Sequence, residues 1–130
     1  MKTLVTGGTG FLGKRLQKKQ PDWMYLSSAD CDLTDAKMVH EMFGDIKPEA
    51  VVHLAARVGG IKDNIENQAD FFYVNTAMNT NVIHEAHKHN INRVLSSLST
   101  CAFPEGLQFF PFDENDFFNG APTKTNFSYG

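Results

Sequence analysis

Short apolar runs alternate along most of the chain with longer segments in which apolar residues recur at helical spacing. The apolar runs are typical of buried strands, and they lie at 2–6, 23–26, 50–54 and 93–96. The helical pattern occupies the intervening segments 11–19, 34–43 and 67–89. This alternation predicts the element order β-α-β-α-β-α-β.

Strands that alternate with helices favour right-handed crossovers and a parallel sheet covered on both faces. The pattern therefore predicts an α/β fold, a Rossmann-like doubly wound sheet that is incomplete, with its first four strands in the order 3-2-1-4. In that order a ligand crevice would open where 7–13 faces 97–101. After residue 101 the composition shifts, and seven of the 11 phenylalanines lie at 103–127, which indicates a long, apolar, irregular loop.

Glycines recur at three-residue intervals between the first predicted strand and the first predicted helix. Gly7 would permit a tight turn, Gly10 would let the backbone approach a pyrophosphate, and Gly13 would let the helix pack close to the sheet. This context is the one that a dinucleotide-binding loop requires. The candidate cofactor-binding residues of the loop are Gly7, Gly8, Thr9, Gly10, Phe11, Leu12 and Gly13. Ser97 and Leu98, which follow the fourth predicted strand, are added because the predicted crevice reaches them.

The residues after the second predicted strand bear on the choice of nucleotide. Ser27 and Ser28 are neutral donors that tolerate a 2′-phosphate, whereas an acidic residue there would bind the ribose 2′-hydroxyl of NAD. NADP(H) is therefore the predicted cofactor, and Asp30 is the competing ribose ligand.

Net charge and the cysteine and histidine residues limit the partners, the cellular compartment and the metal sites that we expect. The formal charge is -3 and the pI is near 5.9, so bulk electrostatics favours neither nucleic acid nor an acidic membrane as a partner. The chain shows no signal sequence or membrane span, and we expect a cytoplasmic protein with Cys31 and Cys101 as free thiols. Three histidines at 84, 87 and 89 lack a completing carboxylate or cysteine cluster, and no metal is predicted. Asn75 and Asn79 share a helix face, where amides usually satisfy loop backbone.

Several motifs together resemble a known enzyme family. The glycine spacing at 6–13, Asp32 and Leu33 after the second strand, and the sequence His-Leu-Ala-Ala at 53–56 resemble the extended short-chain dehydrogenase/reductases. The stretches 55–61, 75–84, 98–104 and 126–129 are similar to the GDP-L-fucose synthases within that family.

The resemblance implies roles for individual residues. Asp32 and Leu33 would line an adenine site, and Leu54, Ala55 and Ala56 would pass along the cofactor. Ser99 matches the family's catalytic serine, Cys101 its epimerisation acid/base, and Tyr129 its catalytic tyrosine. A thiol can remove a proton beside a carbonyl, and a phenol and a hydroxyl can stabilise a carbonyl oxygen that becomes an alkoxide.

The family's activity follows from the same resemblance. It is the NADPH-dependent 3,5-epimerisation and 4-reduction of GDP-4-dehydro-6-deoxy-D-mannose, a GDP-sugar, by a homodimer. The expectation is one NAD(P)-binding domain over 1–130 that ends just after the tyrosine. The family's lysine, tyrosine-motif helix and substrate domain would then lie beyond Gly130. Without that helix, the family's homodimer is not predicted for this chain alone, and we expect the chain alone to be inactive. Two alternatives are a catalytically dead nucleotide-binding module and another NAD-dependent nucleotide-sugar epimerase or dehydratase; Cys101 argues against the second.

Overall fold

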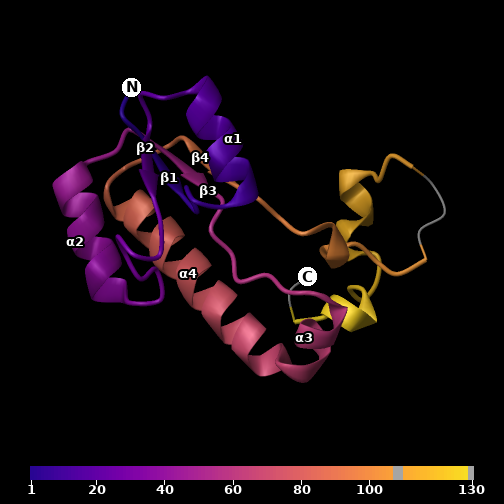
Figure 1. The fold of residues 1–130 in the computed structure, drawn as a ribbon. Coiled ribbons are helices and arrows are strands. Elements are labelled where there is room, and N and C mark those ends of the chain that lie inside the picture. The colour runs from indigo at the N-terminus through magenta and orange to yellow at the C-terminus, as the bar shows by residue number, and fades with distance from the viewer. Residues whose placement is uncertain (107–109, 129–130) are drawn as a thin grey trace. The chain divides into compact units, whose positions relative to one another are not determined.

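The computed structural model describes residues 1–106 and 110–128. Its elements, in chain order, are β1 (Thr3–Thr6), α1 (Phe11–Lys19), β2 (Met24–Leu26), α2 (Ala36–Ile46), β3 (Ala50–His53), α3 (Ile61–Glu66), α4 (Gln68–Lys88) and β4 (Val94–Ser96) (Figure 1). The predicted alternation of strands and helices is confirmed, and α3 is a short addition to it. The chain divides into two compact units, one of residues 1–56 and 76–97 and one of residues 57–75 and 98–130.

The four strands form one parallel sheet in the order β2-β1-β3-β4. The α/β class and the parallel sheet are confirmed, but the predicted strand order 3-2-1-4 is wrong. Burial gives the reason. The most buried strands, β1 and β3, occupy the centre, whereas the partly exposed β2 and β4 lie at the edges. The crossover from β2 therefore passes over β1 and places β3 on its far side.

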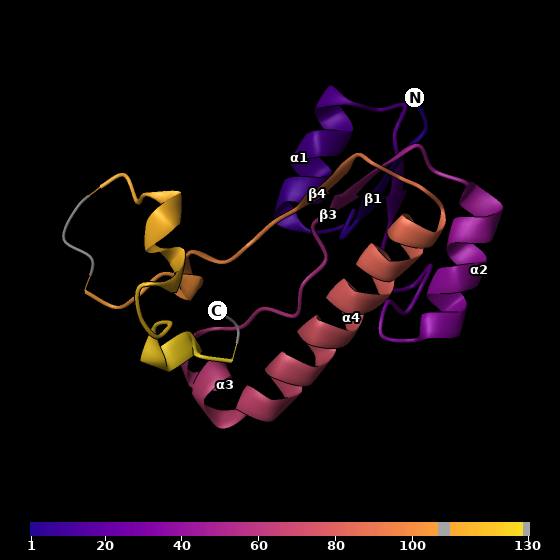
Figure 2. The same cartoon turned by 180° about the vertical axis from the view of Figure 1, so that it is seen from behind.

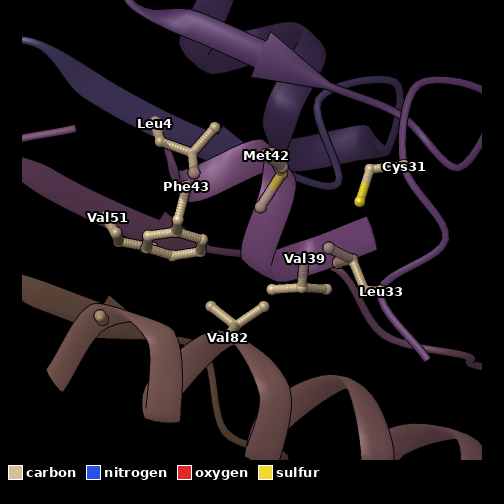
Figure 3. Close-up of a cluster of buried hydrophobic side chains, with 9 residues drawn as sticks. Leu4, Cys31, Leu33, Val39, Met42, Phe43, Val51 and Val82 are labelled. Carbon is tan, nitrogen blue, oxygen red and sulfur yellow. The ribbon is translucent and has the colours of Figure 1, made fainter. Parts of the chain in front are cut away.

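Helices cover both faces of this sheet within the first unit. The strands lie between α1 on one side and α2 with the C-terminal half of α4 on the other (Figures 1 and 2). Phe43 and Val39 of α2 pack with Val82 of α4, and all three are fully buried beneath Leu4 and Val51 of the sheet (Figure 3). Burying one such side chain contributes about 1.5–3 kcal/mol. This cluster is the core that holds the carboxyl ends of the strands in place.

Helix α2 has clear signals at both ends. Asp35 precedes it, and its Oδ1 accepts hydrogen bonds from the backbone N–H groups of Lys37 at 2.8 Å and Met38 at 3.1 Å. Lys47 follows it with a left-handed φ of 49°, and its N–H donates to the carbonyl of Phe43. The two caps set where α2 begins and ends, and thereby which of its residues face the core.

The second unit is built largely from turns. After β4 the chain forms three 3₁₀ turns, η1 (Thr100–Ala102), η2 (Glu114–Phe118) and η3 (Lys124–Asn126). The ring of Phe103 packs against those of Phe112 and Phe117, with centroids 4.8 and 5.1 Å apart. The predicted irregular apolar segment is thus confirmed. None of the helices in the described part of the chain is long and apolar enough to cross a membrane.

Candidate functional site

The glycine loop joins β1 to α1 at the carboxyl edge of the sheet. Gly7 has a φ of 72°, which favours glycine, and a Cβ there would lie 2.7 Å from the nitrogen of Ala55. A Cβ on Gly13 would lie 2.4 Å from the carbonyl oxygen of Gly7. Two glycines therefore let α1, the loop and the residues after β3 approach closely. The predicted reasons for these two glycines, a tight turn and close packing, are confirmed by the geometry.

The start of α1 offers backbone donors at this edge. Gly10 is the N-cap residue and makes no side-chain capping bond, and the first turn contains no acidic residue. Phe11 is 78% exposed, so the helix end is open to solvent. Uncapped first-turn amides carry a partial positive charge, and such a helix end can bind an anion such as a pyrophosphate. Lys14 and Arg15 follow as exposed basic residues.

The strand order sets where the crevice of the sheet begins. Thr6 is in register with Leu26 on one side and with His53 on the other, so three strand ends lie level. The chain leaves β1 towards β2 and leaves β3 towards β4, so the switch in direction falls between β1 and β3. The expected switch between the first and fourth strands is therefore wrong, because β3 lies between them. Leu54, Ala55 and Ala56, which follow β3, border the corrected switch point.

A chain of hydrogen bonds holds the residues that border the switch point between β1 and β3. His53, 2% exposed, lies with its Nε2 2.9 Å from Oδ1 of Asn79 and its Nδ1 2.6 Å from Oγ1 of Thr6. Since the amide oxygen can only accept, Nε2 carries the proton, and the threonine hydroxyl donates to Nδ1. Burial lowers the pKa of His53, an effect that the Asn79 bond partly offsets, so the ring is neutral at pH 7. Oγ1 of Thr6 in turn accepts the N–H of Ala55 at 3.4 Å.

The loop after β2 contains the residues predicted to select the nucleotide. Oδ2 of Asp30 accepts the backbone N–H of Ser27 at 2.8 Å and its hydroxyl at 2.6 Å. These two bonds lower the pKa of Asp30, so a negative charge stands beside Ser27. Ser28 is exposed. The sequence analysis treated Ser27 and Asp30 as competing ligands, whereas the structure couples them in one turn.

Asp32 and Leu33, which the resemblance places at an adenine site, also make structural contacts in the first unit. Oδ1 of Asp32 accepts the N–H and the hydroxyl of Thr34 at 2.9 and 2.7 Å, which lowers the pKa of this exposed carboxyl. Leu33 is buried in the core, and its carbonyl accepts a bond from Nδ2 of Asn81 at 2.9 Å. Their assignment to an adenine site stays a prediction. Ser97 follows β4, and its N–H donates to the carbonyl of His53 at 3.2 Å.

The second unit brings two of the predicted catalytic residues together. Oγ of Ser99, the N-cap of η1, accepts the backbone N–H of Cys101 at 3.0 Å. The serine O–H is still able to donate to a ligand. Cys101 is a free, partly exposed thiol, and its carbonyl accepts the N–H of Thr123 at 3.0 Å, which ties η1 to the chain before η3. Tyr129 lies outside the described residues.

Ser99 also opens into a hollow of about 490 Å³ in the same unit. Its wall is mostly aromatic and apolar, and it is lined by Leu98, Ser99, Thr100, Phe103, Glu114, Phe117 and Phe118. Glu114 is the one acidic residue among those that line the hollow, and no motif or spacing in the sequence marks it. The hollow combines an apolar surface with a hydroxyl pair and one acid, as small-molecule sites commonly do.

Asn75 acts on loop backbone, as expected from its helix face. Its Oδ1 accepts the N–H of Arg57 at 2.8 Å, and its Nδ2 donates to the carbonyl of Arg57 at 3.0 Å. Asn79 differs, because its partner is the His53 side chain. The expected structural role of Asn75 is confirmed.

Comparisons with known proteins identify the family to which the chain belongs. The model of the family described as "NAD dependent epimerase/dehydratase family" matches residues 3–130. A "Probable GDP-L-fucose synthase" of Drosophila melanogaster is 41% identical over 98% of this chain and 42% of that protein. The GDP-L-fucose synthase of Dictyostelium discoideum is 40% identical over 97% of this chain and 41% of that protein.

A solved structure of a similar protein has the same fold as this chain. The GDP-L-fucose synthetase of Naegleria fowleri bound to NADP superposes with a TM-score of 0.86 at 33% identity, covering 98% of this chain and 39% of that one. The chain thus spans about two fifths of the length of the curated relatives that it matches. The resemblance found in the sequence is confirmed by these relatives. With a matching family model over nearly its whole length, the chain belongs to the NAD dependent epimerase/dehydratase family.

Proposed function

We propose that this chain is the cofactor-binding portion of an NADPH-dependent GDP-L-fucose synthase. The observation that carries the proposal is a glycine loop whose backbone leaves no room for a side chain at Gly7 or Gly13, in a chain 41% identical to a relative of that name. The substrate would be the GDP-sugar GDP-4-dehydro-6-deoxy-D-mannose. Epimerisation at carbons 3 and 5 would precede reduction at carbon 4.

The residues of the loop fit a dinucleotide. The uncapped amides at the start of α1 would bind the pyrophosphate, and Leu54, Ala55 and Ala56 would border the cofactor at the β1–β3 switch point. The Ser28 hydroxyl would donate to a 2′-phosphate, in keeping with the NADP named for the Naegleria fowleri structure. When bound, NADPH supplies a hydride to the carbonyl carbon of the substrate.

Ser99 and Cys101 would carry the proton chemistry. A ring carbon beside a carbonyl loses its proton to a modest base because the enolate is stabilised, and the Cys101 thiolate would be that base. Protonation of the enolate on its opposite face, by an acid other than Cys101, inverts the centre. Ser99 would donate its O–H to the carbonyl oxygen, where negative charge develops in both steps. Tyr129 would protonate that oxygen on reduction, a role that rests on the resemblance.

Nucleotide titration tests the cofactor assignment. NADPH should bind this chain more tightly than NADH, as measured by the dissociation constants. Asp30→Asn removes a negative charge beside Ser27 and should tighten NADPH further while it leaves NADH nearly unchanged. Equal affinities in the wild type, or a preference for NADH, would contradict NADP(H) and favour an NAD-dependent epimerase or dehydratase.

Hydrogen exchange tests the catalytic assignment apart from the cofactor. In the chain joined to the family's tyrosine-motif helix and substrate domain, with substrate in deuterated water and no NADPH, deuterium should enter at carbons 3 and 5 through the Cys101 thiol. Cys101→Ala should abolish this exchange, whereas the matched variant Cys31→Ala, in the core of the first unit, should keep it. Equal exchange in both variants would refute the role of Cys101. Cofactor binding by that joined chain without any exchange or reduction would identify a dead nucleotide-binding module.

A further inference from the structure

Two histidines and a glutamate meet where α2 and α4 pack together. His40 lies on α2, Glu85 lies in the last turn of α4, and His89 follows α4 directly. Nδ1 of His40 is 2.9 Å from Oε2 of Glu85, and Nε2 of His89 is 3.7 Å from the same oxygen. All three candidate ligand atoms lie within 4.8 Å of one another. None of these residues belongs to the glycine loop or to the Ser99 hollow.

The carboxylate at the centre of this cluster is buried and ionised. Glu85 is 5% exposed, and its Oε1 accepts a bond from Nζ of Lys88 at 2.7 Å. Burial raises the pKa of Glu85, but the bonds from Lys88 and His40 outweigh it and hold the pKa below its usual range. Oε2 is therefore a charged acceptor that faces two imidazole nitrogens. The ring of His89 is held beside that of Phe43, with centroids 5.7 Å apart.

Two of the three pairs of ligand atoms are spaced close to what a tetrahedral metal site requires, and the third pair lies within 4.8 Å. Zinc binds imidazole nitrogen and carboxylate oxygen at about 2.0–2.2 Å, which places neighbouring ligand atoms roughly 3.4 Å apart. The observed separations of 2.9 and 3.7 Å bracket that value. Two nitrogens and one oxygen suit zinc or a similar transition ion rather than magnesium or calcium.

We propose that His40, Glu85 and His89 form a structural binding site for a zinc-type divalent ion between α2 and α4. Lys88 would remain on the second carboxylate oxygen and orient the ligand, as outer partners commonly do. The His40 side chain is 59% exposed, which gives the ion an entry path and leaves a fourth position for water. An ion held by two helices binds the folded chain alone, so it stabilises the first unit.

The cluster could not be predicted from helix spacing. The sequence analysis considered His84, His87 and His89 on one helix and assigned no metal. The ligand partners of His89 are instead Glu85, four residues before it, and His40, which precedes Glu85 by 45 positions. Packing of α2 against α4 brings them together.

The test is a titration of the whole chain with Zn²⁺, with Co²⁺ as a spectroscopic probe. One equivalent should bind, Co²⁺ should give the strong visible absorption of a four-coordinate site, and Zn²⁺ should raise the melting temperature. His40→Ala, at an exposed position, should weaken Zn²⁺ binding at least about tenfold and remove the thermal shift. His84→Ala, an exposed histidine of the same helix outside the cluster, should change neither.

Glu85→Gln provides a second variant that keeps the shape of the side chain and should weaken binding as His40→Ala does. A wild-type chain that binds no Zn²⁺ while its melting transition shows it to be folded would overturn the proposal. So would equal Zn²⁺ affinities in His40→Ala and His84→Ala.

Discussion

Replacing Gly13 by alanine would place a methyl group against backbone that cannot easily move away. The added Cβ would lie 2.4 Å from the Gly7 oxygen and 2.5 Å from the Gly8 oxygen. Since unstrained heavy-atom contacts lie near about 3.5 Å, α1 would have to move by roughly 1 Å. Such overpacking costs about 1–3 kcal/mol, from which the better helix propensity of alanine recovers at most about 1 kcal/mol. We expect a net loss of about 1–2 kcal/mol in the free energy of unfolding.

The same displacement should weaken cofactor binding, because it moves the first-turn amides of α1 relative to the loop. Losing one or two hydrogen bonds of about 1–1.5 kcal/mol each corresponds to an NADPH affinity that is weaker by about fivefold or more. Urea unfolding and NADPH titration measure the two effects. Gly44→Ala, on α2 where an added Cβ meets nothing within 4 Å, is the matched control and should stabilise by up to about 1 kcal/mol. Wild-type stability and wild-type NADPH affinity in Gly13→Ala would refute this reasoning.

Three further variants test separate parts of the first unit. The neutral, buried His53 takes up its proton at lower pH in the folded chain than in the unfolded chain. The free energy of unfolding should therefore fall as the pH drops below about 6.5. His53→Gln should flatten that part of the pH profile measured by urea unfolding. Asp35→Ala should lose about 1 kcal/mol of capping energy in chemical unfolding; an unchanged midpoint would count against the cap. β4 lies at the edge of the sheet, where a strand can pair with a strand of another copy. Leu95→Lys, at a side chain 58% exposed on β4, should therefore reduce light scattering by the concentrated chain, and equal scattering would exclude such pairing through β4.

The elements could be predicted because their signals are local. Helix α1 has the predicted bounds, and the strands and α4 begin and end within a residue or two of the predicted ranges. Strand order is a property of the whole sheet, and it depends on which strands exclude water from both faces. Ala50 and Val51 are buried, whereas Met24 of β2 and Leu95 of β4 are exposed, a difference that the apolar runs of the sequence do not show. The sequence pattern therefore predicted the parallel class of the sheet but misplaced β3.

The candidate site likewise combines features that the sequence alone predicts with features that depend on the folded chain. The glycine loop could be recognised because its spacing lies within seven consecutive residues between a strand and a helix. The partners of His53 lie 47 residues before it, at Thr6, and 26 after it, at Asn79, so no window of sequence contains them together. The coupling of Ser27 to Asp30 lies within four residues, but it depends on a turn whose geometry residue types alone do not specify.

His53 shows how the fold and the proposed cofactor site depend on each other. A histidine on a buried strand costs free energy unless both ring nitrogens have partners, and Thr6 and Asn79 supply them. Leaving one of them unpaired would cost about 1–3 kcal/mol, so the ring ties the ends of β1 and β3 to α4. Gly7 approaches Ala55 so closely that an added Cβ would lie 2.7 Å from its nitrogen, and this spacing requires the two strand ends to stay in register. A substitution at His53 should therefore loosen the glycine loop without touching the cofactor itself.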